Sequence, residues 1–218
     1  MTDLNLRKIA KLFGLFLLFY AITLPLWLGV KTTYQYIVTV PMFKAAGWVY
    51  DIRLVEAHTE VENIIMTATN RYPSIGFNGK DRSVVFDISL DIDAITFNLP
   101  MTLALLLSIV LTYASSRKQK QNQIFNGMAL LIGLHFLTMF VVSLSLIVST
   151  ALGNEDLKFY LLHAYLPQDL LINLGSLLSS YAARFEPFLI ALFVWWRMQS
   201  SSITVVEKKE KKLEYPEM

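Results

Sequence analysis

Three ionisable side chains within long apolar segments are the strongest candidates for chemistry in this sequence: His135, Arg184 and Glu186. Histidine and glutamate transfer protons in many enzymes and carriers. Ionisable residues at membrane depth usually face protein or a water-filled cavity, and they indicate a functional site by default. The three residues therefore predict a buried polar cluster capable of acid–base chemistry or proton coupling.

The positions of these residues along their helices predict which of them can meet. Arg184 and Glu186 lie about 10–14 Å inside the outer end of the last apolar helix, at ~1.5 Å per residue. They are two positions apart, so they do not share a helix face and each needs its own partner. Glu186 is as far from Arg197 as His135 is from Ile124. His135 and Glu186 are therefore predicted to lie at similar depth, where they can pair.

A structural interpretation of the same residues remains open. Arg184 can extend to the outer headgroups, and a shifted helix would make Glu186 interfacial. Pro187 would then lie in the first turn of a shorter helix, and Glu186 would complement the positive end of that helix. His135 would be a buried histidine bonded to a neighbouring hydroxyl group.

Three aspartates form a weaker candidate site. Asp87, Asp91 and Asp93 lie on one face of a predicted strand and offer oxygen ligands for a hard cation. They lack the loop and glycine of an EF-hand, and a solvated strand face explains them equally well. The chain has no cysteine, which excludes a thiolate nucleophile, a disulfide and a cysteine-bound metal. We therefore predict no cofactor and no assigned metal.

The composition is that of an integral membrane protein. The chain has 218 residues, of which 55% are hydrophobic and 17% are charged, whereas soluble domains carry about 25% charged residues. The uncharged run 12–30, with basic residues on both sides, is long enough for the ~30 Å hydrocarbon core. A net charge of +2 is too small to indicate a nucleic-acid partner. We predict about four transmembrane helices.

The hydropathy and charge patterns divide the chain into helices and connections. The predicted order is a cytoplasmic N-terminus (1–11), transmembrane helix 1 (12–31), an extracytoplasmic segment with a small β domain (32–97), helix 2 (98–115), a basic cytoplasmic loop (116–123), helix 3 (124–152), an outer connection (153–176), helix 4 (177–197) and a charged cytoplasmic tail (198–218). Residues 32–48 either lie at the membrane interface or extend helix 1, and the pattern leaves both open.

The segment between the first two helices has the period of a β-sheet. Its clearest strand has five apolar residues on one face: Val84, Phe86, Ile88, Leu90 and Ile92. Turn-forming residues fill positions 71–82. About three antiparallel strands are predicted. Such a small sheet is marginal by itself, so it needs support from the helices or from a partner.

Lysine and arginine in the short connections predict the orientation. They concentrate in the N-terminus, the loop 116–123 and the tail, and such residues mark the cytoplasmic side. Both termini are therefore predicted in the cytoplasm, and the β segment faces outward. In a bacterial inner (plasma) membrane, that side is the periplasm.

The passage that enters the second helix resembles the small membrane proteins described as exosortase H-associated. The matching residues are Leu99, Pro100, Leu103, Ala104 and Leu105, with the late proline Pro187. The layout is also similar, with one N-terminal helix, an exported β-like segment and then further helices. The resemblance implies an accessory to a protein-sorting transpeptidase and not the enzyme itself.

The sequence favours a non-enzymatic accessory subunit. No recognisable catalytic constellation is present, and the small sheet needs support. We expect contacts with membrane lipids, with a larger membrane protein and with an exported protein substrate. The alternative is a small membrane enzyme or proton-coupled carrier that uses His135, Arg184 and Glu186. A third hypothesis is a lipid- or glycan-handling subunit that uses the aromatic segment 34–50.

Overall fold

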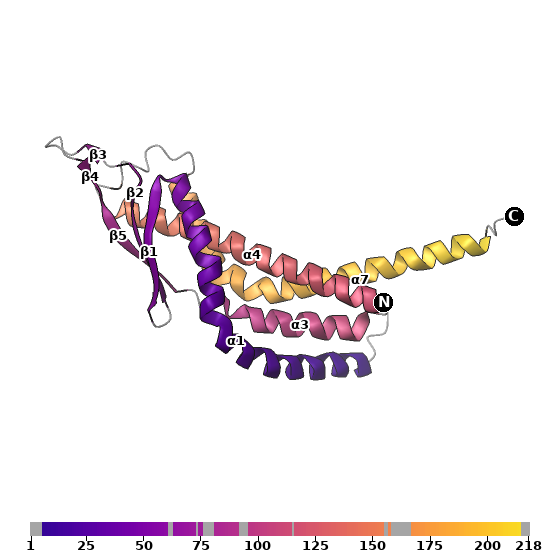
Figure 1. Ribbon diagram of the computed structural model, residues 1–218. Helices are drawn as coiled ribbons and strands as arrows, with labels where there is room; N and C mark the ends of the chain where they lie inside the picture. The colour runs from indigo at the N-terminus through magenta and orange to yellow at the C-terminus, as the bar shows by residue number, and fades with distance from the viewer. Residues whose placement is uncertain are drawn as a thin grey trace. The chain divides into compact units, whose positions relative to one another are not determined.

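The computed structural model describes the following residues: 6–60, 63–72, 74–75, 81–91, 96–114, 116–154, 157 and 167–214. The chain forms two compact units, each assembled from segments that are far apart in the sequence. We name them the helical unit (Met1–Trp27, Asn98–Leu131 and Phe185–Met218) and the mixed unit (Leu28–Phe97 and Ile132–Arg184). The helices α1 (Leu6–Val49) and α4 (Arg117–Leu152) each contribute one part to each unit (Figure 1).

The helical unit is a bundle of apolar helices. It contains the first parts of α1 and α4, all of α3 (Asn98–Tyr113) and nearly all of α7 (Ala183–Glu214). Its core lies between α3 and α7, and α1 and α4 pack against it; the buried members are Leu106, Ile109, Val110, Ala114, Ala191, Val194 and Met198. Gly127 permits a close approach of α4 to α3, because a Cβ atom there would lie 2.7 Å from Leu106 Cδ1.

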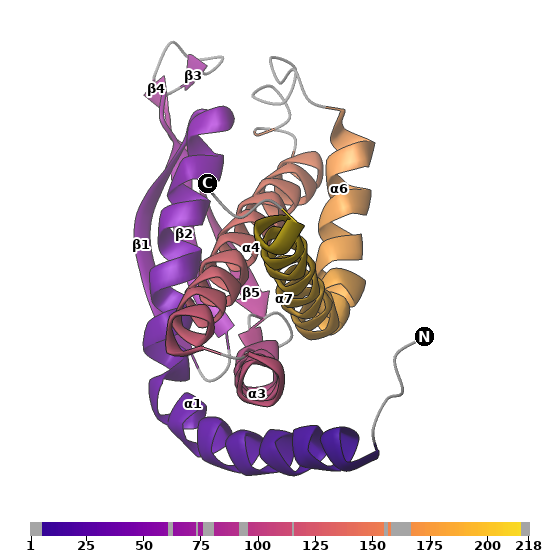
Figure 2. The ribbon, with the colours of Figure 1, turned by 90° about the vertical axis from the view of Figure 1, so that its right-hand side faces the viewer.

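The mixed unit combines helices with a small antiparallel sheet. Its strands are β1 (Ile52–Glu60), β2 (Asn63–Asn70) and β5 (Val85–Asp91), in the order β1-β2-β5, with a separate short pair of β3 (Ser74–Ile75) and β4 (Asp81–Arg82). The helix α6 (Gln168–Leu177) and a π-helical turn η1 (Leu178–Ala182) complete its described part. α6 packs on α4, where Gly175 contacts Ser145 (Figure 2).

The register of the sheet confirms the predicted alternation. Along β2 every second residue, from Ile64 to Asn70, is buried. On β5 Ile88 and Leu90 are buried while their neighbours are exposed. The pairing of β5 with β2 is regular throughout, whereas that of β1 with β2 shifts between Leu54 and Glu56. Ile92 and Asp93 lie outside the described residues.

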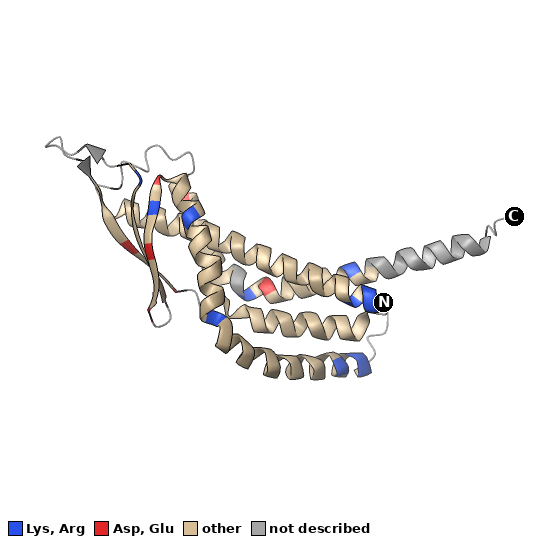
Figure 3. Cartoon of the chain, in the orientation of Figure 1, with Lys and Arg blue, Asp and Glu red and all other residues tan. Residues whose placement is uncertain are grey.

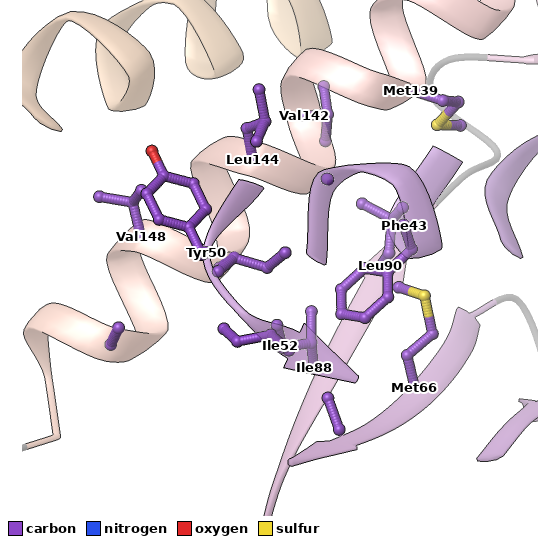
Figure 4. Close-up of a cluster of buried hydrophobic side chains, with 14 of the residues drawn as sticks. Phe43, Tyr50, Ile52, Met66, Ile88, Leu90, Met139, Val142, Leu144 and Val148 are labelled. Carbon is purple, nitrogen blue, oxygen red and sulfur yellow. The ribbon is translucent and has the colours of Figure 1, made fainter. Parts of the chain in front are cut away.

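The buried face of the sheet is covered by the ends of α1 and α4. Phe43 and Ala46 of α1 are fully buried among Met66 and Ile88 of the strands. Figure 4 shows side chains of both helices and all three strands meeting in this core, which includes Phe43, Tyr50, Ile52, Met66, Ile88, Leu90, Met139, Val142, Leu144 and Val148. Burial of apolar surface contributes about 25 cal/mol per Å². The helices thus provide the support that a three-stranded sheet needs.

The turn from α1 into β1 depends on two unusual backbone positions. A Cβ atom on Gly47 would lie 2.7 Å from the carbonyl oxygen of Ile52, so only glycine lets the strand start this close to the helix. Asp51 has a φ of 52°, and aspartate tolerates this left-handed conformation better than most residues. The carbonyl of Asp51 accepts a hydrogen bond from the Arg71 N–H at 2.6 Å.

A buried asparagine links the end of β2 to the chain before β5. Asn70 is 4% exposed. Its Oδ1 accepts a hydrogen bond from the Val84 N–H at 2.8 Å, and its Nδ2 donates to the Tyr72 carbonyl at 2.7 Å. Because both polar ends of the amide are bonded, its burial does not leave an unsatisfied group.

Residues 32–48 are part of α1, so they extend the first helix, which is one of the two alternatives that the sequence left open. The helices differ from the predicted segments in three other places. The predicted loop 116–123 belongs to α4, which begins at Arg117 because its Lys, Gln and Arg residues are good helix formers. Within the predicted connection 153–176, α6 begins at Gln168, and α7 continues to Glu214 through the predicted tail.

Two helices of the described chain are long and apolar enough to cross a membrane, namely α1 with 44 residues and α4 with 36. The number rises to three if Gln168–Tyr181 and Arg184–Gln199 form one broken span. α3 is apolar but has only 16 residues, just below the usual range of a span. Length and composition are therefore compatible with a membrane protein, and the finer prediction of four spans stays a prediction.

Candidate functional site

His135 is buried in the mixed unit and is bonded to a tyrosine. It lies on α4 with none of its surface exposed. Its Nδ1 is 2.6 Å from the hydroxyl oxygen of Tyr34 on α1, and the two rings meet edge to face with centroids 5.8 Å apart. The hydroxyl donates if Nδ1 is unprotonated and accepts if Nδ1 carries the proton. This pair is a short connection between two groups that can both transfer protons.

Further buried polar groups lie close to this pair along α1. The Gln35 Nε2 donates to the hydroxyl of Thr96 at 2.9 Å, and both side chains are buried. Thr39, one turn after Gln35, is fully buried, and its hydroxyl has no hydrogen-bond partner among the described residues. Buried polar groups without partners are uncommon. The extension of α1 therefore presents a polar row inside the mixed unit.

Glu186 and Arg184 face different surroundings. Glu186 is 6% exposed and belongs to the buried stripe of α7 that continues with Ile190 and Val194. Arg184 and Phe185 are exposed. Glu186 therefore points into packed protein within the helical unit, as a functional intramembrane carboxylate would.

The predicted cluster of His135, Arg184 and Glu186 is divided between the two units. His135 and Arg184 belong to the mixed unit and Glu186 to the helical unit. The pair His135–Glu186 therefore stays a prediction. Pro187 lies inside α7, which begins at Ala183. It is thus beyond the first turn that the structural interpretation assigned to it.

The aspartates of β5 form part of the solvent-facing side of the sheet. Asp87 and Asp91 are exposed, and Asp87 Oδ1 accepts a hydrogen bond from the Thr67 hydroxyl at 2.6 Å. The described residues contain no group of three or more histidine, aspartate or glutamate side chains that could hold a metal ion. Cross-strand hydrogen bonding on a solvated face accounts for Asp87.

A surface hollow on α7 offers no groups for acid–base chemistry. Its lining consists of Leu189, Leu192, Phe193, Trp195 and Trp196. Leucine and phenylalanine have no polar side-chain atom, and the indole N–H of tryptophan only donates. This hollow is therefore unsuitable as a catalytic pocket.

The sequence-based prediction missed the partners of His135. The sequence pattern places Tyr34 in the aromatic segment 34–50 and singles out neither Gln35 nor Thr96. One signal was present, because Gln35 and Thr39 are polar residues one turn apart, with Tyr34 next to Gln35, in a segment that continues an apolar helix. Their partners lie far away in the sequence, so spacing alone did not reveal the bonds.

Comparison with known proteins provides no assignment of function. No protein-family model, curated protein or solved structure matches the chain.

Proposed function

We propose that this protein is a non-enzymatic membrane subunit that presents its small sheet, outside the bilayer, to a larger membrane protein or to an exported segment. The observation that carries the proposal is the construction of the mixed unit. One face of the sheet is buried against the ends of two membrane-length helices, and the other face is mostly polar and largely exposed.

The sheet belongs outside the hydrocarbon for a physical reason. An open sheet has edge N–H and C=O groups that lipid cannot satisfy. α1 has 44 residues, or about 66 Å of helix, whereas the hydrocarbon core is ~30 Å thick. The part of α1 that packs on the sheet, around Phe43, is therefore the part that leaves the bilayer.

The distribution of basic residues supports a cytoplasmic location for both ends of the chain. Within the helical unit, the starts of α1 and α4 carry lysine and arginine and lie at the same end of the bundle (Figure 3). Basic residues at one end of a membrane helix bundle favour a cytoplasmic location for that end. The β segment, which a helix of membrane length separates from the basic start of α1, is then expected on the extracytoplasmic side, which is the periplasm if the membrane is a bacterial inner membrane.

The proposed pathway rests on the resemblance to exosortase H-associated proteins. The resemblance implies an accessory role in protein sorting, in which a separate transpeptidase supplies the nucleophile. The absence of cysteine from this chain agrees with an accessory role, because a thiolate nucleophile would have to come from the partner.

A co-purification experiment tests the proposal. The full chain would be tagged, extracted from native membranes in mild detergent and analysed by mass spectrometry. We expect a larger membrane protein in a stoichiometric amount. Tagged protein recovered alone would contradict an accessory role. A variant with Phe43→Ala, which removes the support of the sheet, is the control that should lose the partner if the sheet mediates contact.

A second candidate function is favoured by one observation, the buried pair of Tyr34 and His135 at 2.6 Å. In a proton-coupled carrier or small enzyme, this pair and the buried Glu186 would transfer protons. A Glu186→Gln or Tyr34→Phe change would then abolish transport or turnover while abundance and assembly stay normal. Loss of assembly instead would identify these residues as structural contacts.

A further inference from the structure

The two edges of the three-stranded sheet are built differently. At the edge strand β1, the pairing shifts between Leu54 and Glu56, and the hydroxyl of Tyr36 on α1 donates to the carbonyl of Ala57 at 3.4 Å. At the other edge, β5 pairs regularly with β2 along its whole length. Among the described residues, β5 has a neighbouring strand on one side only.

This difference matters because an exposed edge attracts further strands. Edge strands present unpaired N–H and C=O groups, and proteins discourage pairing there with bulges, prolines and outward-pointing lysines. β1 carries a register shift, and one of its carbonyls accepts a hydrogen bond from Tyr36. β5, with the sequence VFDISLD, has no bulge, no proline and no lysine or arginine. β5 is therefore the edge that is open to strand addition.

The side chains of β5 define what kind of strand would fit. On the inner face, Phe86, Ile88 and Leu90 continue the apolar core of the mixed unit. On the outer face, Asp87 and Asp91 are exposed. A strand added beside β5 extends both faces, because strand side chains alternate. It would place apolar residues against the core row and basic residues opposite the aspartates.

We propose that β5 is the docking edge for an extended segment of a partner protein that alternates apolar and basic residues. This inference rests on the proposed function and names the surface and the chemistry of the contact. Main-chain hydrogen bonds supply the pairing, and the alternating side chains supply the selectivity. A second copy of this chain fits less well, because pairing β5 with itself brings Asp87 and Asp91 of two chains onto one face, where like charges repel.

A peptide-binding experiment tests the chemistry of the site. The probe is a fluorescent peptide of alternating lysine and valine, and the measurement is its anisotropy with the purified full-length protein in detergent. The comparison peptide replaces lysine with glutamate. We expect binding of the lysine peptide only. Equal binding of both peptides, or of neither, would overturn the proposal.

Charge variants on the two edges locate the binding. Glu56 lies in the same cross-strand row as Asp87, and Glu60 in the same row as Asp91, but on the opposite edge. The double change Asp87→Asn with Asp91→Asn should raise the Kd of the lysine peptide roughly threefold to tenfold, as expected for two lost charge pairs. The matched change Glu56→Gln with Glu60→Gln should leave it unchanged. The reverse ranking, or equal effects, would contradict docking at β5.

Cross-linking provides a geometric readout that does not depend on charge. His58 and Ser89 are exposed residues of one row, on opposite edges, and the chain has no native cysteine. A lysine–valine peptide with one central cysteine, oxidised with copper phenanthroline, should form a disulfide with the Ser89→Cys variant and not with the His58→Cys variant. A Ser89→Cys variant that links instead to a second copy would favour self-association and overturn the proposal.

The failures of the two proposals are distinguishable. If the native partner co-purifies equally with the wild type and with the Asp87→Asn, Asp91→Asn variant, the accessory function stands and the assignment of β5 falls. If no partner co-purifies while the peptide binds at β5, the accessory function falls and the edge remains a peptide-binding site.

Discussion

The helical unit and the mixed unit distribute polarity in opposite ways. In the helical unit, large apolar side chains such as Phe13, Leu26 and Phe188 are exposed, while the carboxylate of Glu186 is buried. In the sheet of the mixed unit, apolar residues of the inner face such as Met66 and Ile88 are buried, and the exposed face is mostly polar, with residues such as Asp87. Lipid accepts an apolar exterior and water a polar one. The contrast is compatible with a membrane protein in which the helical unit meets lipid and the sheet meets water.

The comparison also shows where stability resides. The exposed apolar residues of the helical unit gain little from packing within the chain. The mixed unit depends on side chains that join α1 and α4 to the strands. Substitutions in the two units should therefore differ in cost, which the Phe43 and Phe13 variants test, and effects that are no larger are expected at other positions of the mixed unit.

The largest effect should follow removal of Phe43. The Phe43→Ala change empties a fully buried position between α1 and the sheet, and such truncations cost about 3–5 kcal/mol. Hydrogen exchange of the β2 amides measures the loss of local stability. The matched control is Phe13→Ala on the same helix, which is 59% exposed and should leave β2 unchanged. Equal effects of both variants would contradict the division into two units.

The next effect should come from the turn between α1 and β1. The Gly47→Ala change forces a Cβ atom against the Ile52 carbonyl at 2.7 Å, and overpacking of this kind costs about 1–3 kcal/mol. Gly29 on the same helix has no atom within 4 Å of an added Cβ, so Gly29→Ala should be neutral or slightly stabilising. Denaturant unfolding in detergent distinguishes the two. A neutral Gly47→Ala variant would show that the turn can relax.

A loss of comparable size is expected at Asn70. The Asn70→Ala change leaves the Val84 N–H and the Tyr72 carbonyl without their partner, at a cost of about 1–3 kcal/mol. Faster hydrogen exchange should appear first at Val84, immediately before β5. The neighbouring Thr69→Val change, which removes only a hydrogen bond of 3.3 Å, should have less effect. Unchanged exchange at Val84 would show that this bond does not hold the strand.

The Tyr34→Phe change should cost less still. It removes the hydroxyl that bonds to His135 at 2.6 Å while keeping the ring, and a neutral hydrogen bond contributes about 1 kcal/mol. The expected signature is a shift of the His135 imidazole resonances in NMR. The exposed Tyr181→Phe variant is the control. An unshifted His135 spectrum in the Tyr34→Phe variant would contradict the pairing.

The smallest effect is a pH dependence at Tyr50. Burial raises the pKa of the Tyr50 hydroxyl above its usual value of 10.0. A raised pKa stabilises the folded protein below the unfolded value, and that contribution is lost as the pH rises above 10.0 toward the folded pKa. The Tyr50→Phe variant should therefore lose less stability between neutral and strongly alkaline pH than the wild type. An identical alkaline response in both proteins would contradict this assignment.

The sequence determined the features that depend on local pattern. The uncharged run 12–30 is helical because a long apolar segment favours a helix in which every backbone group is satisfied. The strand at 85–91 follows from period-two alternation, which buries one face of any sheet it joins. The opposite exposures of Arg184 and Glu186 follow from their spacing, since a helix turns about 100° per residue.

The tertiary structure decided which distant residues meet. Residues 32–48 extend α1 because their apolar side, with Val38 and Phe43, is buried against strands and α4, and no pattern within the segment shows that surface. His135 bonds to Tyr34 across 101 positions of sequence for the same reason. Spacing fixes the direction in which a side chain points. Tertiary packing alone decides which residue the side chain meets there, because packing depends on how segments that are distant in the sequence fit together.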